Sequence, residues 1–204
     1  MSLGNWKGSS GWVAMNDPTG VLNGICLQAS SGIGQLCEDY ITQEIGTSND
    51  FNKVHYTVQC DLAYKDGEDL NMAISMVARA SNYTTSVKKP YVPQQKYIGI
   101  IDFNVSQVAI IRYLDNQNQI VARGSLNLAL QANMKNSFSL SCYGSPDTGG
   151  TKISINVNGK SLLSYTDISG LQILSGAPGF QVQNGTVYIN NFAVMELDAY
   201  GNPV

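Results

Sequence analysis

Charged residues are scarce in this sequence of 204 residues, where Asp, Glu, Lys and Arg together make up 13%. A typical globular protein contains about 25%, and here Asn, Gln, Ser and Thr take their place. The net charge is −3, and no basic run is longer than Lys88-Lys89. Because proteins that bind nucleic acids usually carry a basic stripe or patch, we expect no nucleic-acid partner.

Long apolar runs are also absent. No stretch reaches the roughly 18 apolar residues that a membrane-spanning helix needs, so we expect no membrane span. The chain begins MSLGNWKG, without the charged start and apolar stretch of a signal peptide; a leader removed before this point is the alternative. The localisation is therefore unknown from the sequence, although the polar, weakly charged composition favours an extracellular, cell-surface or virion protein.

Cysteine and histidine occur in no pattern that binds zinc. His55 is the only histidine, and no C-x-x-C pair occurs among the four cysteines, which are Cys26, Cys37, Cys60 and Cys142. Cys60 and Cys142 fall on the apolar phase of expected strands, so we expect no disulfide between them and free thiols in the core. A Cys26–Cys37 or Cys60–Cys142 disulfide is the alternative.

Oxygen-rich turns are the only candidates for a metal site. The segments 66–69 and 115–118 contain Asp, Glu, Asn and Gln, which could supply oxygen ligands for calcium. Turn residues of this kind usually hydrogen-bond to their own backbone instead. We therefore predict no metal and no other cofactor.

Apolar and polar residues alternate along much of the chain. The pattern is clearest where Ile153, Ile155 and Val157 alternate with polar neighbours, the period of two of a half-buried strand. Asn158-Gly159 follows, a pair preferred in type I′ hairpin turns. A partner strand is expected at 160–166, a turn at 176–179, and further strands at 21–29, 37–44, 54–62, 70–80, 97–105, 107–114, 120–126, 138–142 and 187–197.

The arrangement of these segments predicts the fold class. The sequence shows no convincing helix and no internal repeat, and the expected strands recur roughly every 10–15 residues, as in an antiparallel sandwich or barrel. A length of 204 residues fits one domain over the whole chain. One long segment, 81–95, carries prolines, lysines and tyrosines between two strands. Long loops in compact β domains are often functional, although many are variable surface.

Four short motifs carry a resemblance to a known superfamily. They are Val157-Asn158-Gly159-Lys160, Tyr165-Thr166-Asp167, the segment 175–180 and the segment 187–194. In this order they resemble the C-terminal half of the concanavalin A-like lectin/glucanase superfamily, and more narrowly its laminin-G-like and sugar-hydrolase-like domains. The resemblance covers about residues 54–197 and leaves the N-terminal strands and irregular segment at 1–50 unmatched. It implies an all-β, antiparallel two-sheet β-sandwich of jelly-roll type.

No catalytic motif accompanies the resemblance. The glucanase members carry E-x-D-x-x-E on one strand, which places two carboxyls on one face for a retaining mechanism. The closest match, Glu38-Asp39 with Glu44, has another spacing and is interpreted as solvated acids beside a turn. Lyase members use Arg, Gln, His and Tyr, and here His55 and Gln59 share a strand face without the rest of that pattern. The sequence favours a protein without catalytic activity and predicts no catalytic residue, but it leaves an enzyme open.

The most consistent hypothesis is a non-catalytic, lectin-like module that binds a carbohydrate or glycan. Tyr83 and Tyr91 would stack on sugar rings, and the complete set of predicted ligand-binding residues is Gln59, Arg79, Tyr83, Tyr91, Asp102 and Asn104. Because one fold serves many functions, two alternatives stay open. The first is a structural or decoration subunit of a virion or other large assembly, with self-association. The second is a glycoside hydrolase or polysaccharide lyase.

Overall fold

The computed structural model describes residues 6–8, 12–32, 36–41, 51–65, 71–84, 92–128 and 130–204. Within these ranges the secondary structure is almost entirely strand, with one 3-10 turn at Pro146–Thr148. No helix in this part of the chain is long and apolar enough to cross a membrane. The all-β class predicted from the period-two pattern is confirmed.

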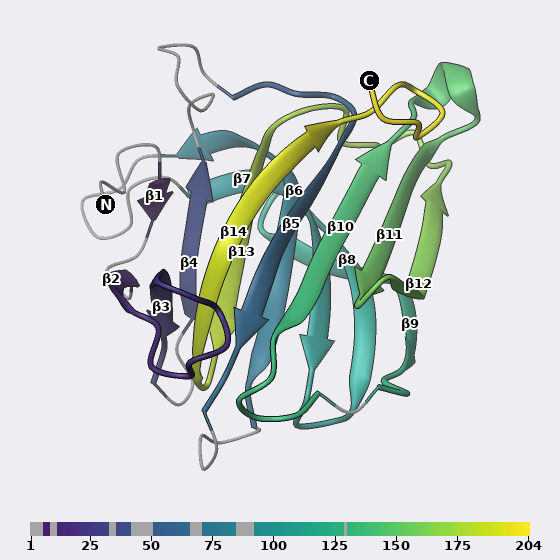
Figure 1. Ribbon diagram of the computed structural model, residues 1–204. Coiled ribbons are helices and arrows are strands. Elements are labelled where there is room, and N and C mark those ends of the chain that lie inside the picture. Colours follow the sequence, from purple (N-terminus) through teal and green to yellow (C-terminus); the bar gives the residue numbers. More distant parts are fainter. Residues whose placement is uncertain are drawn as a thin grey trace.

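The strands form two seven-stranded antiparallel sheets. In spatial order, sheet A contains β1 (Trp6–Gly8), β4 (Leu36–Ile41), β13 (Ala177–Gln183), β6 (Ala73–Thr84), β7 (Val92–Asp102), β8 (Gln107–Leu114) and β9 (Gln117–Ser125). Sheet B contains β12 (Lys160–Asp167), β11 (Thr151–Val157), β10 (Asn136–Tyr143), β5 (Tyr56–Ala63), β14 (Thr186–Glu196), β3 (Ile25–Ser30) and β2 (Trp12–Asn16). Figure 1 shows the two layers, with β14, β5 and β10 in front of β13, β6 and β8. This is the predicted two-sheet sandwich.

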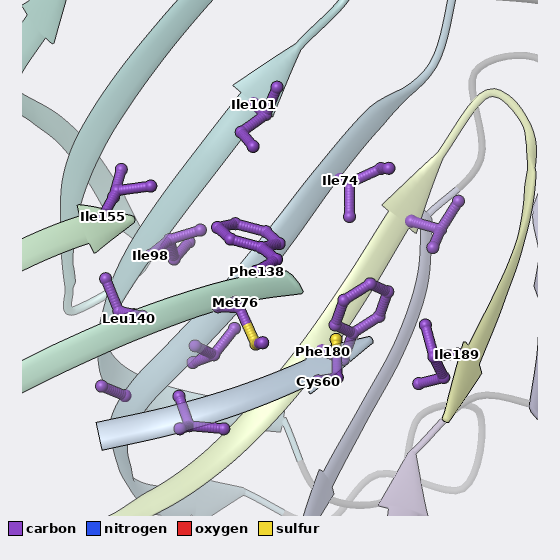
Figure 2. Close-up of a cluster of buried hydrophobic side chains, with 14 of the residues drawn as sticks. Cys60, Ile74, Met76, Ile98, Ile101, Phe138, Leu140, Ile155, Phe180 and Ile189 are labelled. Atoms are coloured by element: carbon purple, nitrogen blue, oxygen red, sulfur yellow. The ribbon is translucent and has the colours of Figure 1, made fainter. Parts of the chain in front are cut away.

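The core lies between the sheets and is built from alternate residues of each strand (Figure 2). The apolar phase of the expected strands places ten residues between the sheets, and eight of them are buried, namely Tyr56, Val58, Ile74, Met76, Phe138, Leu140, Ile153 and Ile155. Val54 was expected there as well but is 41% exposed, because β5 begins only at Tyr56. Phe192 is partly buried against the core. A Cβ on Gly99 would lie 2.7 Å from Cδ1 of Leu140, so this glycine permits close contact between the sheets.

The turn and the thiols agree with the sequence predictions. Asn158 and Gly159 have φ of 52° and 75°, so both central residues of the β11–β12 hairpin adopt the left-handed conformation of a type I′ turn.

Cys60 and Cys142 are buried and not disulfide-bonded. Cys26 is also free, which excludes the alternative Cys26–Cys37 disulfide. Burial raises the pKa of the Cys142 thiol to about 11, so this thiol is protonated at neutral pH.

Several segments differ from the sequence prediction. The segment 81–95, expected to be a loop, is largely strand, since β6 runs to Thr84 and β7 begins at Val92. Residues 176–179 were expected to form a turn, but β13 begins at Ala177 and contains Pro178 and Gly179. The register of β13 against β6 shifts between Ala177 and Gly179, and this irregularity accommodates Pro178, which has no N–H to donate to the ladder. No strand was expected before residue 21, but Trp12 begins strand β2. The expected strand at 37–44 is observed as β4, and 42–50 lie outside the described residues.

Candidate functional site

Charged and polar side chains gather on the outer face of sheet A, the face turned away from sheet B. The register places Glu38 of β4 opposite Gln181 of β13, and Lys96 of β7 opposite Tyr113 of β8. Tyr40 lies two residues beyond Glu38 and so points to the same side of the sheet. These five residues, from four strands of sheet A, are called the Lys96 cluster below.

The Lys96 cluster is held together by hydrogen bonds that converge on one carboxylate oxygen. Tyr40 Oη, Lys96 Nζ and Gln181 Nε2 donate to Oε2 of Glu38 over 2.6, 3.2 and 2.9 Å. Lys96 Nζ also donates to Tyr40 Oη over 2.7 Å. The ammonium group lies 5.3 Å from the ring centroid of Tyr40 and 5.1 Å from that of Tyr113, within the range of cation–π attraction. The lysine is therefore fixed between two aromatic rings and a carboxylate.

The Lys96 cluster is shielded from water although it faces away from sheet B. Tyr40, Gln181 and Lys96 are only 0%, 4% and 6% exposed. Burial by itself raises the pKa of Glu38, but the charge of Lys96 and the hydrogen bonds from Tyr40, Lys96 and Gln181 outweigh it, so this pKa lies below its ordinary value. Removing an ion pair from water is costly, and desolvated, hydrogen-bonded charges are typical of functional sites.

This position corrects one interpretation made from the sequence. Glu38 was interpreted as a solvated acid beside a turn, but it lies within β4 and its side chain is 15% exposed. Its carboxylate can accept hydrogen bonds, Lys96 and Gln181 can donate them, and the half-buried ring of Tyr113 offers an apolar face. These are the groups that recognise polyhydroxylated ligands. Glu44, the other acid of that motif, lies outside the described residues.

The long hairpin at 81–95 continues from the Lys96 end of sheet A. Ser81 pairs with Gln95 and Tyr83 with Pro93, so β6 and β7 extend beyond Lys96 toward the connecting residues. Tyr91 and the rest of 85–91 lie outside the described residues, and so does the side chain of Tyr83. The backbone register thus places Tyr83 at the end of sheet A that carries the Lys96 cluster.

Asp102 and Asn104 lie at the opposite end of β7. Asp102 is six residues from Lys96 along the strand, about 20 Å at the usual rise of a β-strand. Its Oδ1 accepts a hydrogen bond of 3.0 Å from the backbone N–H of Asn104 and thereby caps the turn before β8. Asn104 is exposed. The structure therefore does not bring this pair together with Tyr83.

Gln59 lies on the other side of the molecule. It belongs to β5 in the centre of sheet B, where it pairs with Ser139 of β10 and faces outward. Gln59 is thus separated from Asp102 and Asn104, which lie at one end of sheet A. Alternation predicted correctly that Gln59 faces outward, but it contains no information on which sheet a strand joins.

Arg79 is the predicted site residue whose position differs most from expectation. Alternation along β6 places it on the outer face, but a register shift between Ala78 and Ser81 and a φ of 54° turn its side chain inward. Arg79 is 0% exposed. Its guanidinium donates to the carbonyl oxygens of Val54, Gly144 and Ile173 and to Oγ1 of Thr151. A role in ligand binding does not agree with this position; Arg79 ties loops of the two sheets together.

A second buried ion pair lies between the sheets. Arg112 of β8 donates to Asp167 of β12, with 3.0 Å between Nη1 and Oδ2, and Tyr97 donates to the same oxygen over 2.7 Å. Asp167 is 0% exposed. Burial alone raises its pKa, but hydrogen bonds from Ser169 and Tyr97, with the charge of Arg112, lower it overall. This Asp of the Tyr165-Thr166-Asp167 motif therefore joins the sheets rather than contacting a ligand.

Metal ligands do not gather in the described part of the chain, where no group of His, Cys, Asp and Glu side chains could hold an ion. The single histidine, His55, accepts a hydrogen bond at Nδ1 from the backbone N–H of Gly144. Burial and the nearby charge of Arg79 lower its pKa. The Lys96 cluster, a water-shielded ion pair on an outer face, is therefore the candidate site.

Comparison with known proteins identifies the fold. No protein-family model and no curated protein matches the sequence. Among solved structures, the carbohydrate-binding module CBM66 from Bacillus subtilis has a TM-score of 0.65 and 14% identity, with 95% of this chain and 96% of that chain covered. An alginate lyase solved with an alginate tetrasaccharide has a TM-score of 0.59 and 11% identity, covering 96% and 88%. A β-glucanase from Bacillus licheniformis has a TM-score of 0.55 and 12% identity, covering 93% and 91%. The chain therefore has a concanavalin-like jelly-roll fold.

Proposed function

We propose that this protein is a non-catalytic carbohydrate-binding module whose ligand lies on the outer face of sheet A, against the Lys96 cluster. The observation that carries the proposal is the ion pair of Glu38 and Lys96, which is hydrogen-bonded and nearly excluded from water on the face of sheet A turned away from sheet B. The likeness of fold to a carbohydrate-binding module over nearly the whole of both chains supports the same proposal.

Each residue of the Lys96 cluster has a distinct role in this proposal. Glu38, whose side chain is 15% exposed, accepts hydrogen bonds from sugar hydroxyls. Lys96 and Gln181, which are 6% and 4% exposed, orient its carboxylate through the hydrogen bonds that they donate to it. Tyr40 holds the carboxylate and the ammonium in place through its hydroxyl. The ring of Tyr113 packs against the apolar face of a pyranose, together with Tyr83 and Tyr91 from the hairpin.

A ligand of several sugar units would extend along β7. Asp102 and Asn104, at the far end of that strand, would then contact its last units. For a ligand held by a few hydrogen bonds and ring contacts, we expect dissociation constants on the order of 10–1000 μM, or about −4 to −7 kcal/mol.

A glycan array followed by calorimetry tests this proposal. The variants are Tyr113→Ala and Tyr91→Ala, and the matched control is Tyr200→Ala, which changes a tyrosine that is 73% exposed near the C-terminus. Each of the first two should weaken glycan binding by about 1 kcal/mol, or roughly fivefold in Kd. Tyr200→Ala should leave the Kd unchanged. Absence of binding to every glycan, or equal Kd values in all three variants, would overturn the proposal.

A second candidate function is that of a subunit in a large assembly. The segment between β12 and β13 presents three large aliphatic side chains to solvent, since Ile168, Leu171 and Leu174 are 78%, 58% and 49% exposed. Grouped exposed apolar residues are typical of interaction surfaces. In that case Leu171→Ser should reduce the oligomeric mass measured by light scattering, whereas Tyr113→Ala should not. A monomeric wild-type protein at all concentrations would exclude self-assembly through this segment.

A further inference from the structure

Three polar side chains form a row across the outer face of sheet B. In the registers of β5 with β10 and of β10 with β11, Gln59 lies opposite Ser139, and Ser139 opposite Asn156. Directly paired residues point to the same side of a sheet, and neighbouring strands are about 4.8 Å apart. The row is therefore about 10 Å long, which suits a small molecule lying across the strands.

This row forms the floor of a depression. The depression encloses about 360 Å³ and is lined by Gln59, Asp61, Ser139, Asn156, Gly159 and Asn191, among others. Small-molecule sites usually measure roughly 300–1,000 Å³, so the depression is at the small end of that range. All six of these residues are half-buried or exposed, and a ligand from solvent can reach them.

Two β-bulges and one turn shape the rim. The register of β14 with β5 shifts between Asn190 and Ala193, where Asn191 has a φ of 50°. The register of β11 with β12 shifts at Asn156 itself. The Asn158 side chain, whose Oδ1 accepts from the backbone N–H of Ser137 over 2.9 Å, fixes the turn that contains Gly159. Bulges redirect side chains and are over-represented beside functional sites.

The floor residues differ from the rim in their hydrogen bonding. Asp61 is satisfied on both oxygens, since Ser137 Oγ donates to Oδ1 and Asn191 Nδ2 to Oδ2, each over 2.8 Å. Within the described part of the chain, no protein group hydrogen-bonds to the side chains of Gln59, Ser139 and Asn156. Two carboxamides and a hydroxyl, aligned in one row, therefore offer free donors and acceptors to the depression.

The chemistry of these groups identifies the class of ligand. A bound cation would need several charged oxygen ligands, but Asp61 is the carboxylate of this lining and already has its partners. An anion would need a cation aimed at it, and Lys135 lies 3.6 Å from Asp61 instead. A neutral ligand with adjacent donors and acceptors fits, because each carboxamide can accept from one hydroxyl and donate to the next. We propose that this depression is a second saccharide site, for a neutral mono- or disaccharide, on the sheet opposite the Lys96 cluster.

Nuclear magnetic resonance with isotope-labelled protein tests the second site directly. The probes are glucose, galactose, mannose, fructose, maltose, cellobiose, lactose and sucrose, each titrated separately. A binding probe should shift the side-chain amide signals of Gln59 and Asn156. The variants Gln59→Ala and Asn156→Ala should each weaken this response by about five- to tenfold in Kd, the worth of one or two hydrogen bonds. The control Thr166→Ala, an exposed residue on the same face of β12 outside the lining, should leave Kd unchanged.

Failure of this inference and failure of the proposed function give different results. No shift of the Gln59 and Asn156 signals with any probe would overturn the second site, whatever the Lys96 cluster binds. A response unchanged in both Gln59→Ala and Asn156→Ala would overturn it as well. Tyr113→Ala should alter binding at sheet A only, so a sheet B response that survives in this variant supports an independent site. Thermal unfolding of each variant establishes that it is folded, since a matching melting temperature is expected for these partly exposed positions.

Discussion

The two outer faces of the sandwich handle polar residues in opposite ways. On sheet A, Glu38 and Lys96 are charged, nearly excluded from water and already hydrogen-bonded to each other. On sheet B, Gln59 and Asn156 are neutral, reachable from solvent and without protein hydrogen-bond partners. The side chains of the Lys96 cluster are fixed by their mutual hydrogen bonds, so the loss of one of them leaves the others without a partner. The side chains on sheet B cost the fold little and leave their hydrogen-bonding capacity for a ligand. Substitutions in the Lys96 cluster should therefore lower the free energy of unfolding. Substitutions of Gln59 or Asn156 should change ligand binding and leave stability nearly unchanged.

Lys96→Met should have the largest effect. The substitution leaves the Glu38 carboxylate desolvated without its cation, so we expect the free energy of unfolding to fall by about 3–5 kcal/mol. Urea denaturation measures this, with Lys160→Met as the control because Lys160 is exposed on β12 and should change stability by less than about 0.5 kcal/mol. The double variant Lys96→Met/Glu38→Gln should recover part of the loss. Equal free energies of unfolding of the two lysine variants would show that the Lys96 cluster does not stabilise the fold.

Acid should act on sheet A through the same carboxylate. The folded-state pKa of Glu38 lies below its ordinary value of 4.5, so its ionisation stabilises the fold at any pH above that ordinary value. This stabilisation is lost as the pH falls through the folded-state pKa. Asp61 and Asp167, whose pKa values are also lowered, contribute in the same direction.

Urea denaturation of wild type and Glu38→Gln across this pH range isolates the contribution of Glu38. The stability advantage of wild type over Glu38→Gln should be greatest near neutral pH and should shrink as the pH falls below about 4–5. A difference that does not change with pH would contradict the pKa assignment of Glu38.

The sequence predicted the fold correctly where the structure depends on residues close together in the chain. The alternation at 153–157 and the Asn158-Gly159 pair predicted the β11–β12 hairpin correctly, because side-chain period and turn preference depend on neighbours in the chain. Arg79 shows the limit of alternation. A single β-bulge in β6 shifts the phase by one residue and moves the side chain from the outer face to the interior.

The Lys96 cluster could not be found from local patterns. Its members come from β4, β7, β8 and β13, and the order β4-β13-β6-β7-β8 brings them together. Periodicity tells which way a side chain points but not which strands are neighbours. The signal that the sequence did offer was a lysine just before the apolar run of β7, a position where a charged residue is unusual.

Asn158→Ala should have an intermediate effect, at the boundary of the sheet B depression. The substitution removes the hydrogen bonds to Ser137 and Asn136, each 2.9 Å, and places alanine at a φ of 52°. We expect a loss of about 1–2 kcal/mol in the free energy of unfolding. Asn158→Gly keeps the positive φ without strain and should lose less, which separates the conformational effect from the hydrogen bonds. Chemical denaturation of both variants measures the two contributions, and an alanine variant as stable as wild type would contradict this account of the rim.

Ser139→Ala and Asn156→Ala should have the smallest effect on stability, and this is the sharpest test of the contrast between the two faces. Both side chains point out of sheet B and have no hydrogen-bond partner among the described residues. Their removal therefore leaves no buried donor or acceptor without its partner, which is what makes polar substitutions costly. We expect the free energy of unfolding to change by less than about 0.5 kcal/mol in either variant, against several times that for Lys96→Met. If Asn156→Ala instead lowered stability as much as a residue of the Lys96 cluster does, Asn156 would have a structural role, and the row on sheet B would be part of the fold rather than a surface left free for a ligand.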